Sequence, residues 1–407
     1  MELGNKPRSK RRNLGITIIK GDRNMSEIAA QPGDVIDFSQ AEMPVKIEDR
    51  SFDSKMVPQL VAYLKDIRDN SLDYVVPGPK LEVKPVGASA WELWIDGPEG
   101  MKIFRPTNWA QGQTVGKTPL PKKYHDTLLN AGKAELATIN LNEWLREQDK
   151  VMVRTVGDKF RAMVSDRYRA FDNLDLFSQT AKAVENVNQS RQSINQDYQP
   201  VQFWKADATE TTLFVSILDK GQEYDIGKGD KFNVMLTVKN SEVGKSSMSI
   251  EPSFFRGMCL NLYSREPALR KIHSGEKLDS GIFSADTRQA QRDLWQKEVR
   301  DVFNATLVNT DFFDAWAAEF RESKEVRPAD MTVAVHKVSE EYSFTQAEEE
   351  AIMAALMTDR TIFPEDRGTG YALINAMTVA SKDMGLERMH DMAKIAGNVK
   401  NVMKVVC

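Results

Sequence analysis

Four stretches between residues 201 and 254 alternate apolar with more polar side chains, and this alternation constrains the fold more than any other feature of the chain. A period of two is the pattern of a β-strand that buries one face. Turn residues separate the later stretches, as in Gly227-Lys-Gly-Asp230 and Glu242-Val-Gly-Lys245. The pattern predicts an antiparallel meander whose polar face meets water or a partner. Its predicted strands lie at residues 201–205, 213–217, 232–238 and 248–254.

A predicted hairpin precedes the meander. Val151–Val156 and Phe160–Val164 have strand patterns, and the Gly157-Asp158 pair between them is a turn signal. The hairpin and the meander together mark residues 151–263 as the stretch where we expect the working surface of the protein.

A polar signature, Ser165–Asn173, joins the hairpin to a predicted helix. Asp172 is a candidate N-cap, because a side-chain oxygen at that position accepts hydrogen bonds from N–H groups of the first helical turn. Apolar residues at helical spacing follow over residues 174–188. The expected fold class is therefore α+β: an antiparallel β-meander core packed on this helix, with an N-terminal arm and small β region and a C-terminal helical region.

Changes in composition divide the chain into four predicted regions. Residues 1–50 contain a basic cluster, Lys6–Arg12, and are expected to form a largely disordered tail. Residues 51–130 are expected to form a small accessory α/β region. The α+β core follows at 131–285, and a helical region at 286–407.

Several elements are predicted outside the core. In the accessory region the spacing predicts a helix over Met56–Asp69 and strands at 81–86, 91–95 and 101–104. A helix is also expected at 141–146, with Asn140 as its N-cap. The C-terminal region shows helical apolar spacing at 295–306, 312–322, 345–357, 370–383 and 386–405.

Composition narrows the class of protein. A formal net charge of −4 argues against a wholly basic nucleic-acid coat, but it leaves a local basic surface open. The two cysteines, Cys259 and Cys407, are too few for a disulfide framework, which fits a reducing compartment. No apolar run approaches the roughly 20 residues of a membrane helix. We therefore expect a cytoplasmic protein that does not enter a membrane.

Motifs for catalysis, metals and nucleotides are weak. Gly244-Lys-Ser-Ser247 resembles the end of a phosphate-binding loop, but position 239 is Lys where that motif requires Gly, and a strand pattern follows. The histidines lack metal-ligand spacing. Cys259 is interpreted as core packing, while a nucleophilic pair with His273 stays open. The sequence predicts no catalytic residue, no metal site and no cofactor, and an enzyme is less expected than a binding protein.

Basic and aromatic residues are interleaved through the predicted working stretch. Proteins that bind single strands need cations for the phosphates and flat rings on which bases stack. We expect such a groove if these side chains share one face, and the alternative is a solvated sheet edge with ion pairs. The predicted nucleic-acid-binding residues are Arg161, Arg167, Tyr168, Arg169, Trp204, Lys205, Arg256 and Arg265.

A family resemblance rests on four motifs in the same order. They are Arg161–Asn173, Gly229–Asn233, Lys239–Gly244 and Phe255–Asn261. Over roughly residues 135–310 the chain resembles the phage/plasmid-like proteins, a family of unknown function carried by prophages and plasmids. The resemblance implies a gene of a mobile element in a prokaryotic host or its virus, and hence a location in the cytoplasm of a prokaryotic host cell. A strand-rich core flanked by helices is also similar, at the level of fold, to phage single-strand annealing proteins of the RecT and Red-beta types.

The leading hypothesis is a non-catalytic, oligomeric protein that binds single-stranded DNA in phage or plasmid recombination or replication. One alternative is an anti-defence or interaction factor that acts on a host protein through an acidic surface, made of Glu340, Glu341, Glu348, Glu349 and Glu350. The other is a metal-dependent nuclease that would use Asp166, Asp172 and Asp175.

Overall fold

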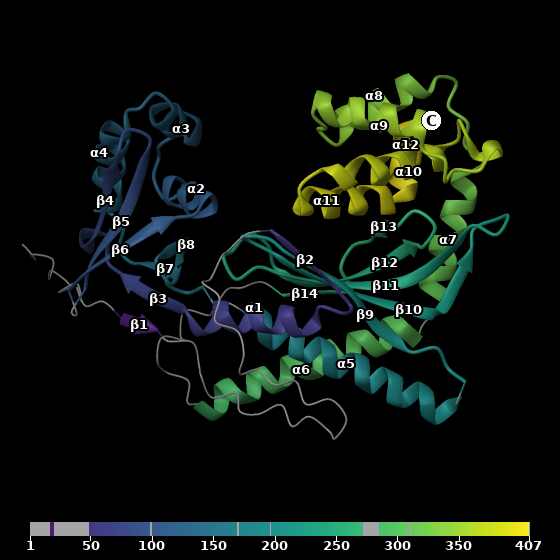
Figure 1. Ribbon diagram of the computed structural model, residues 1–407, viewed down its shortest axis with the longest axis horizontal. Coiled ribbons are helices and arrows are strands. Elements are labelled where there is room, and N and C mark those ends of the chain that lie inside the picture. The colour runs from purple at the N-terminus through teal and green to yellow at the C-terminus, as the bar shows by residue number, and fades with distance from the viewer. Residues whose placement is uncertain are drawn as a thin grey trace, which may run out of the picture. The chain divides into compact units, whose positions relative to one another are not determined.

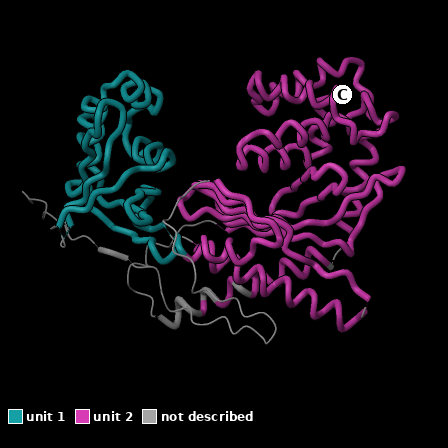
Figure 2. Tube along the Cα trace, viewed as in Figure 1, with its two compact units in different colours: residues 1–45, 66–168 teal, residues 46–65, 169–407 magenta. Residues whose placement is uncertain are grey.

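The chain folds as an α+β protein, which confirms the predicted class (Figure 1). The structure, a computed structural model, describes residues 17–19, 49–97, 100–168, 171–195, 197–271, 285–308 and 311–406. Most of the predicted N-terminal tail lies outside these residues. The described chain contains two compact units, shown in Figure 2. The first unit consists of residues 1–45 and 66–168, and the second of residues 46–65 and 169–407.

The first unit is built on a mixed sheet with the strand order β1-β3-β7-β8-β6-β5-β4. Its strands are β1 (Thr17–Ile19), β3 (Ser71–Val76), β4 (Leu81–Val86), β5 (Ala90–Gly97), β6 (Gly100–Pro106), β7 (Val151–Val156) and β8 (Lys159–Ser165). Only β6 and β8 pair in parallel among these described strands. Its helices are η1 (Gly78–Lys80), α2 (Asn108–Gly116), α3 (Lys122–Asn130) and α4 (Ala134–Leu145).

The predicted N-terminus of α4 is wrong. The helix begins at Ala134 rather than after Asn140, because apolar positions upstream extend the helical stripe. Ala134, Ala137 and Leu141 are all buried against the core of the first unit. The side chain of Asn142 anchors the helix to β4 by accepting a hydrogen bond from Val83 N–H at 2.8 Å and donating to Val83 O at 2.9 Å.

The predicted hairpin belongs to the first unit and the predicted meander to the second. β7 and β8 pair in antiparallel fashion around Gly157, as expected from the turn signal. However, their sheet is completed by β3 and β6, strands that lie earlier in the chain. The stretch 151–263 is therefore not one structural core, since the boundary between the compact units falls at residues 168 and 169.

The second unit contains the predicted meander in an antiparallel sheet with the order β13-β12-β11-β10-β9-β2. Its strands are β2 (Arg50–Asp53), β9 (Val201–Ala208), β10 (Leu213–Asp225), β11 (Lys231–Asn240), β12 (Met248–Arg256), β13 (Asn261–Ser264) and β14 (Leu269–Lys271), which pairs with β12. Phe232 and Val234 are buried as predicted, but so are Met235 and Thr237 on the opposite face of β11. The predicted polar face is thus partly covered, since Asn233 and Lys239 on it are half-buried.

Helix α5 (Asn173–Ile194) packs on this sheet, as predicted. The Asp172 carboxylate caps it by accepting hydrogen bonds from Leu174 N–H at 2.8 Å and Asp175 N–H at 3.2 Å. Phe177 contacts Phe203 of β9 edge to face, with ring centroids 5.9 Å apart. The prediction that the signature Ser165–Asn173 ends in an N-cap is confirmed.

The remaining helices follow the predicted pattern with two differences. They are α1 (Val57–Asp69), α6 (Ala285–Val308), α7 (Asp311–Ser323), α8 (Met331–Glu341), α9 (Gln346–Thr358), η2 (Pro364–Asp366), α10 (Gly370–Ala380), η3 (Ser381–Asp383), α11 (Leu386–Gly397) and α12 (Val399–Val406). Helix α8 was not predicted, and the single helix expected at 386–405 is broken at Asn398. No described helix has the length and apolar character needed to cross a membrane.

The break between α11 and α12 has a local cause. Gly397 ends α11 against the backbone of β13, and its carbonyl accepts a hydrogen bond from the Trp316 indole N–H at 2.9 Å. A Cβ on residue 397 would lie 2.1 Å from the carbonyl oxygen of Ser264. The absence of a side chain at this position allows α11 to approach the sheet.

We predict that Gly397→Ala lowers the free energy of unfolding by at least about 2 kcal/mol, because backbone atoms must move apart to admit the new methyl group. Gly385→Ala is the matched control, since a Cβ there meets no atom within 4 Å. Urea unfolding followed by circular dichroism measures both variants. Equal midpoints for the two would contradict the predicted close contact.

Candidate functional site

The predicted nucleic-acid-binding residues are divided between the two units. In the first unit, Arg161 lies buried on β8. Tyr168 is 9% exposed, and its ring lies 5.8 Å below the Arg154 guanidinium. Arg167 is exposed. Arg169 lies outside the described residues. Arg161 and Tyr168 thus contribute to the interior rather than to a surface groove.

Two arginines of the second unit are also used by the fold. Arg256 is fully buried, and its guanidinium donates to both carboxylate oxygens of Asp230, at 2.7 and 3.1 Å. Arg265 pairs with Glu319 and lies over the ring of Trp316. Arg256 therefore faces no open surface, and Arg265 is partly exposed but already paired.

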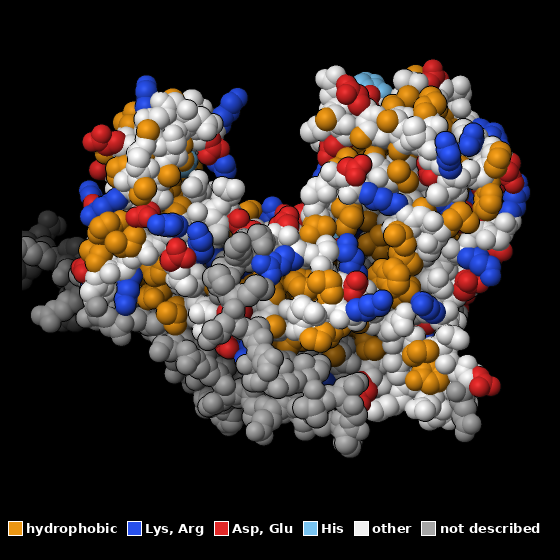
Figure 3. All heavy atoms as spheres, viewed as in Figure 1, with side chains coloured by type: hydrophobic (Ala, Val, Ile, Leu, Met, Phe, Trp, Pro, Cys, Tyr) orange, Lys and Arg blue, Asp and Glu red, His pale blue; other side chains and the backbone are white. Residues whose placement is uncertain are grey.

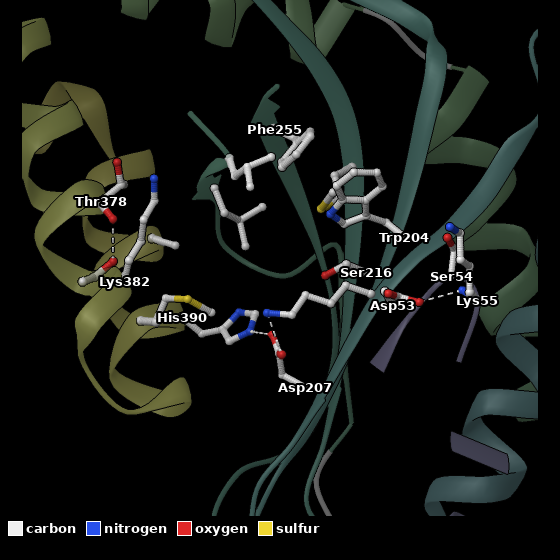
Figure 4. A pocket seen from close by; sticks show the side chains of 17 residues that line it. Asp53, Ser54, Lys55, Trp204, Asp207, Ser216, Phe255, Thr378, Lys382 and His390 are labelled. Atoms are coloured by element: carbon white, nitrogen blue, oxygen red, sulfur yellow. Dashed lines mark hydrogen bonds and ion pairs between the residues drawn. The ribbon is translucent and has the colours of Figure 1, made fainter. Parts of the chain in front are cut away.

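Trp204 and Lys205 line a pocket within the second unit (Figure 4). The pocket has a volume of about 380 Å³. One wall is formed by strands of the sheet, and the opposite wall by residues of α10, η3 and α11. Since every lining residue belongs to the second unit, that unit alone forms the pocket.

The sheet side of the pocket is aromatic and apolar. The rings of Trp204 and Phe255 lie side by side, with centroids 5.0 Å apart (Figure 4). Met235 packs with Phe255 beneath them, and Leu262 covers the flank. Trp204 is only partly buried, so part of its indole ring is accessible. Its contact with Phe255 fixes the position of the ring. Such a surface accepts flat or apolar groups.

Asp207 organises the polar end of the pocket. Its carboxylate pairs with the Lys205 ammonium at 2.8 Å, accepts a hydrogen bond from the Ser51 hydroxyl at 2.6 Å, and lies 3.4 Å from His390 Nε2. Burial raises the pKa of Asp207, but the hydrogen bond with His390 and the charge of Lys205 outweigh it, so the pKa lies below its ordinary value. The carboxylate is therefore ionised at neutral pH.

His390 connects the two walls of the pocket. It projects from α11 toward Asp207 of β9, as Figure 4 shows. Its imidazole stacks on Phe214 with ring centroids 3.7 Å apart. The position of the ring is therefore fixed by one polar and one aromatic contact.

Lysines lie around the pocket, together with a carboxylate. Lys55 and Lys205 lie on the side of β2 and β9, and Lys382 lies on η3 across from them. The ammonium of Lys382 donates to the carbonyl oxygen of Cys259. Asp53 accepts a hydrogen bond from the Lys55 backbone N–H at 2.8 Å. Figure 3 shows that basic and apolar side chains are also interspersed over the surface of the second unit.

The candidate carboxylates of a nuclease do not assemble. Asp172 is the N-cap of α5, and Asp166 is exposed. Within the described part of the chain, no three His, Cys, Asp or Glu side chains gather closely enough to hold a metal ion. Cys259 is buried, in line with the packing interpretation, and His273 lies outside the described residues.

The predicted acidic surface is partly engaged in local contacts. Glu348 forms a capping box with Thr345 and pairs with Arg388 at 2.6 Å. Glu349 lies 3.2 Å from His336. Glu340 and Glu350 are exposed. The acidic residues therefore include members that stabilise the ends and contacts of helices α8, α9 and α11.

Comparisons with protein-family models, with curated proteins and with solved structures find no match to this chain. The functional argument therefore rests on the pocket itself.

Asp207, His390 and Lys382 are pocket residues that the sequence did not indicate. Asp207 and His390 are 183 positions apart, and no local pattern links them. The pairing of β9 with β10 shifts register at Trp204, so Trp204, Lys205 and Asp207 all line the pocket and strict alternation along β9 would not have identified Asp207. Phe203 packs on α5, so Trp204 faces away from that helix.

We predict that Asp207→Asn lowers the free energy of unfolding by about 2 kcal/mol at neutral pH, because Lys205 and His390 lose their charged partner. The native pKa of Asp207 lies below its unfolded value, so its carboxylate stabilises the fold above a pH of about 4 and ceases to do so as pH falls through the native pKa. The difference between wild type and variant should therefore shrink in acid. Urea titrations across this pH range measure it.

Asp391→Asn is the control for this titration, because Asp391 is exposed on the same helix. Its effect on unfolding should be small at every pH. A difference for Asp207→Asn that stays constant down to the lowest pH would contradict a charge-dependent role.

Proposed function

We propose that the second unit binds single-stranded nucleic acid at this pocket, without catalysis. An unpaired base stacks on Trp204, and Lys55 and Lys205 pair with the flanking phosphates. The observation that carries the proposal is an accessible aromatic wall, Trp204 beside Phe255, adjoined by Lys205 in one pocket. Stacking and cationic groups together are what a single strand requires of a binding site.

The lysines distinguish this proposal from the binding of an uncharged apolar ligand. A hydrophobic pocket has no need of cations, yet Lys55 and Lys205 line this one. A base bound in the pocket has a phosphate on each side of it in the nucleic-acid chain, and a nearby positive charge stabilises each phosphate. Lysine serves as a point charge for phosphate without fixing its geometry, which suits binding that is independent of sequence.

The wider role rests on the resemblance to phage/plasmid-like proteins. A protein that holds bases unpaired supports annealing during recombination or replication of a mobile element. An oligomer would place several such pockets along one strand, and cooperative binding is common among single-strand binders. The hypotheses of an oligomer and of a phage or plasmid setting remain part of this proposal.

We predict that Trp204→Leu weakens binding of a fluorescent oligothymidine by roughly tenfold or more, since stacking contributes about 1–3 kcal/mol per base. Leucine preserves apolar packing against Phe255 but removes the flat ring. Trp204→Phe keeps a ring and should lose much less affinity. Fluorescence anisotropy at low salt measures all three proteins, and equal affinities would contradict stacking on this residue.

We predict that the double variant Lys55→Gln, Lys205→Gln lowers the salt dependence of binding. The slope of log K against log salt should fall by roughly 0.7 for each phosphate contact that is lost. Lys337→Gln is the matched control, because Lys337 is exposed on α8 and does not line the pocket. Wild-type binding that shows no salt dependence, or no binding at low salt, would overturn the proposed function.

A further inference from the structure

We infer that the turn at residues 257–260 acts as a wedge beside a base that enters the pocket. The wedge consists of the side chains of Met258 and Leu260, which take the place of the neighbouring base in the stack. The inference rests on the proposed function and specifies how the strand is held.

The pocket is large enough to receive a base. Its volume of about 380 Å³ lies within the range for small-molecule sites, about 300–1,000 Å³. A base that leaves the stack of its own strand to enter the pocket uncovers a face of each neighbouring base.

Two large apolar side chains project from the turn between β12 and β13. Leu260 lines the pocket, yet its residue surface is 62% exposed, and Met258 is 57% exposed. Apolar side chains of this size gain stability by burial, and the fold buries neither of these two. A base face is a flat apolar surface that both side chains can cover.

The backbone of the turn is strained at the residue that reaches the pocket. Leu260 has a φ of 57°, in the left-handed region where a side chain with a Cβ is disfavoured. Strain of this kind persists only when the surrounding structure enforces it, and it concentrates at functional positions. A glycine or an asparagine would adopt this conformation more readily.

Hydrogen bonds of the buried Cys259 hold the turn in the conformation that places Leu260 in the left-handed region. The Cys259 N–H donates to the Arg256 carbonyl at 3.3 Å, and the Arg256 guanidinium donates to Cys259 Sγ at 3.3 Å. The Lys382 ammonium holds the Cys259 carbonyl from the other wall. The backbone N–H, the Sγ atom and the backbone carbonyl of Cys259 are thus all hydrogen-bonded, and its side chain points inward. The side chains of its neighbours, Met258 and Leu260, point outward.

This arrangement gives Arg256 a positioning role. Arg256 touches no ligand in it, because its guanidinium is fully buried on Asp230. It fixes the turn, and the turn presents the wedge. Apolar wedges that enter between bases are a general means by which proteins unstack nucleic acid.

The experiment compares two labelled probes. One is an oligothymidine, and the other has the same length with a single thymine flanked on both sides by abasic positions. Leu260→Asn removes the apolar side chain while retaining a residue that tolerates the left-handed region. Leu260→Met keeps an apolar side chain and is the matched control. Circular dichroism and thermal unfolding establish that each variant is folded.

If Leu260 acts as a wedge, Leu260→Asn should weaken binding only of the probe in which the thymine has neighbouring bases. Its affinity for oligothymidine should fall on the order of fivefold, since an apolar contact with a base replaces part of a stacking interaction. Its affinity for the abasic-flanked probe should be unchanged, and Leu260→Met should bind both probes as wild type does. Met258→Ser provides a second, independent test with the same expected selectivity.

Equal losses on both probes would show that Leu260 is only a wall of the pocket, and no loss on either would show that the turn does not touch the strand. Either result overturns the wedge and leaves the proposed function standing, provided that Trp204→Leu still weakens binding. If wild-type protein binds neither probe, the proposed function itself fails.

Discussion

The buried ion pair between Arg256 and Asp230 is the interaction on which the second unit depends. A charge without contact with water is tolerated only when it is paired and fully hydrogen-bonded. Asp230 meets this requirement by accepting from the guanidinium and from the Tyr371 hydroxyl at 2.5 Å, and Arg256 also donates to the Thr361 carbonyl at 2.7 Å. Because Tyr371 belongs to α10, the pair fixes the C-terminal helices to the sheet (Figure 1). The two walls of the pocket owe their separation to this attachment, and the strained turn at Cys259 is held by the same guanidinium.

The alternation of side chains was sufficient to predict the meander, and the capping carboxylate was sufficient to predict the start of α5. Both are local signals, in which residues two to four positions apart determine the backbone. The pocket depends instead on pairs such as Asp207 and His390, which chain topology brings together across 183 positions. The sequence therefore indicated Trp204 and Lys205 on the sheet wall, but nothing in it identified the residues of the opposite wall. The division of residues 151–263 between two sheets was equally inaccessible, because it depends on pairing with earlier strands.

The position of Arg256 was nevertheless implicit in the strand pattern. Pro252 and Phe254 occupy the inward face of β12, and residue 256 is the next position on that face. Phe254 packs on Trp316 with ring centroids 4.5 Å apart, so the arginine that follows enters the same interior. Arginine between aromatic residues is as typical of a buried network as of a phosphate site. The face of the strand on which the arginine lies distinguishes these two roles. Phe255, on the other face, reaches the pocket instead.

The four motifs at residues 161–173, 229–233, 239–244 and 255–261 are separated in sequence but meet in pairs in the fold. Asn173 donates its backbone N–H to Glu242 at 2.8 Å and accepts from the Asn240 amide at 2.7 Å, which joins the first motif to the third. The second and fourth motifs meet through Asp230 and Arg256. These motifs thus specify contacts within the fold, which suffices to account for their polar residues without a ligand. In the fourth motif, Phe255–Asn261, the fold buries Arg256, Cys259 and Asn261 but leaves the side chains of Met258 and Leu260 exposed. Met258 and Leu260, whose exposure the fold does not explain, are therefore the residues to which we assign contact with the nucleic-acid strand.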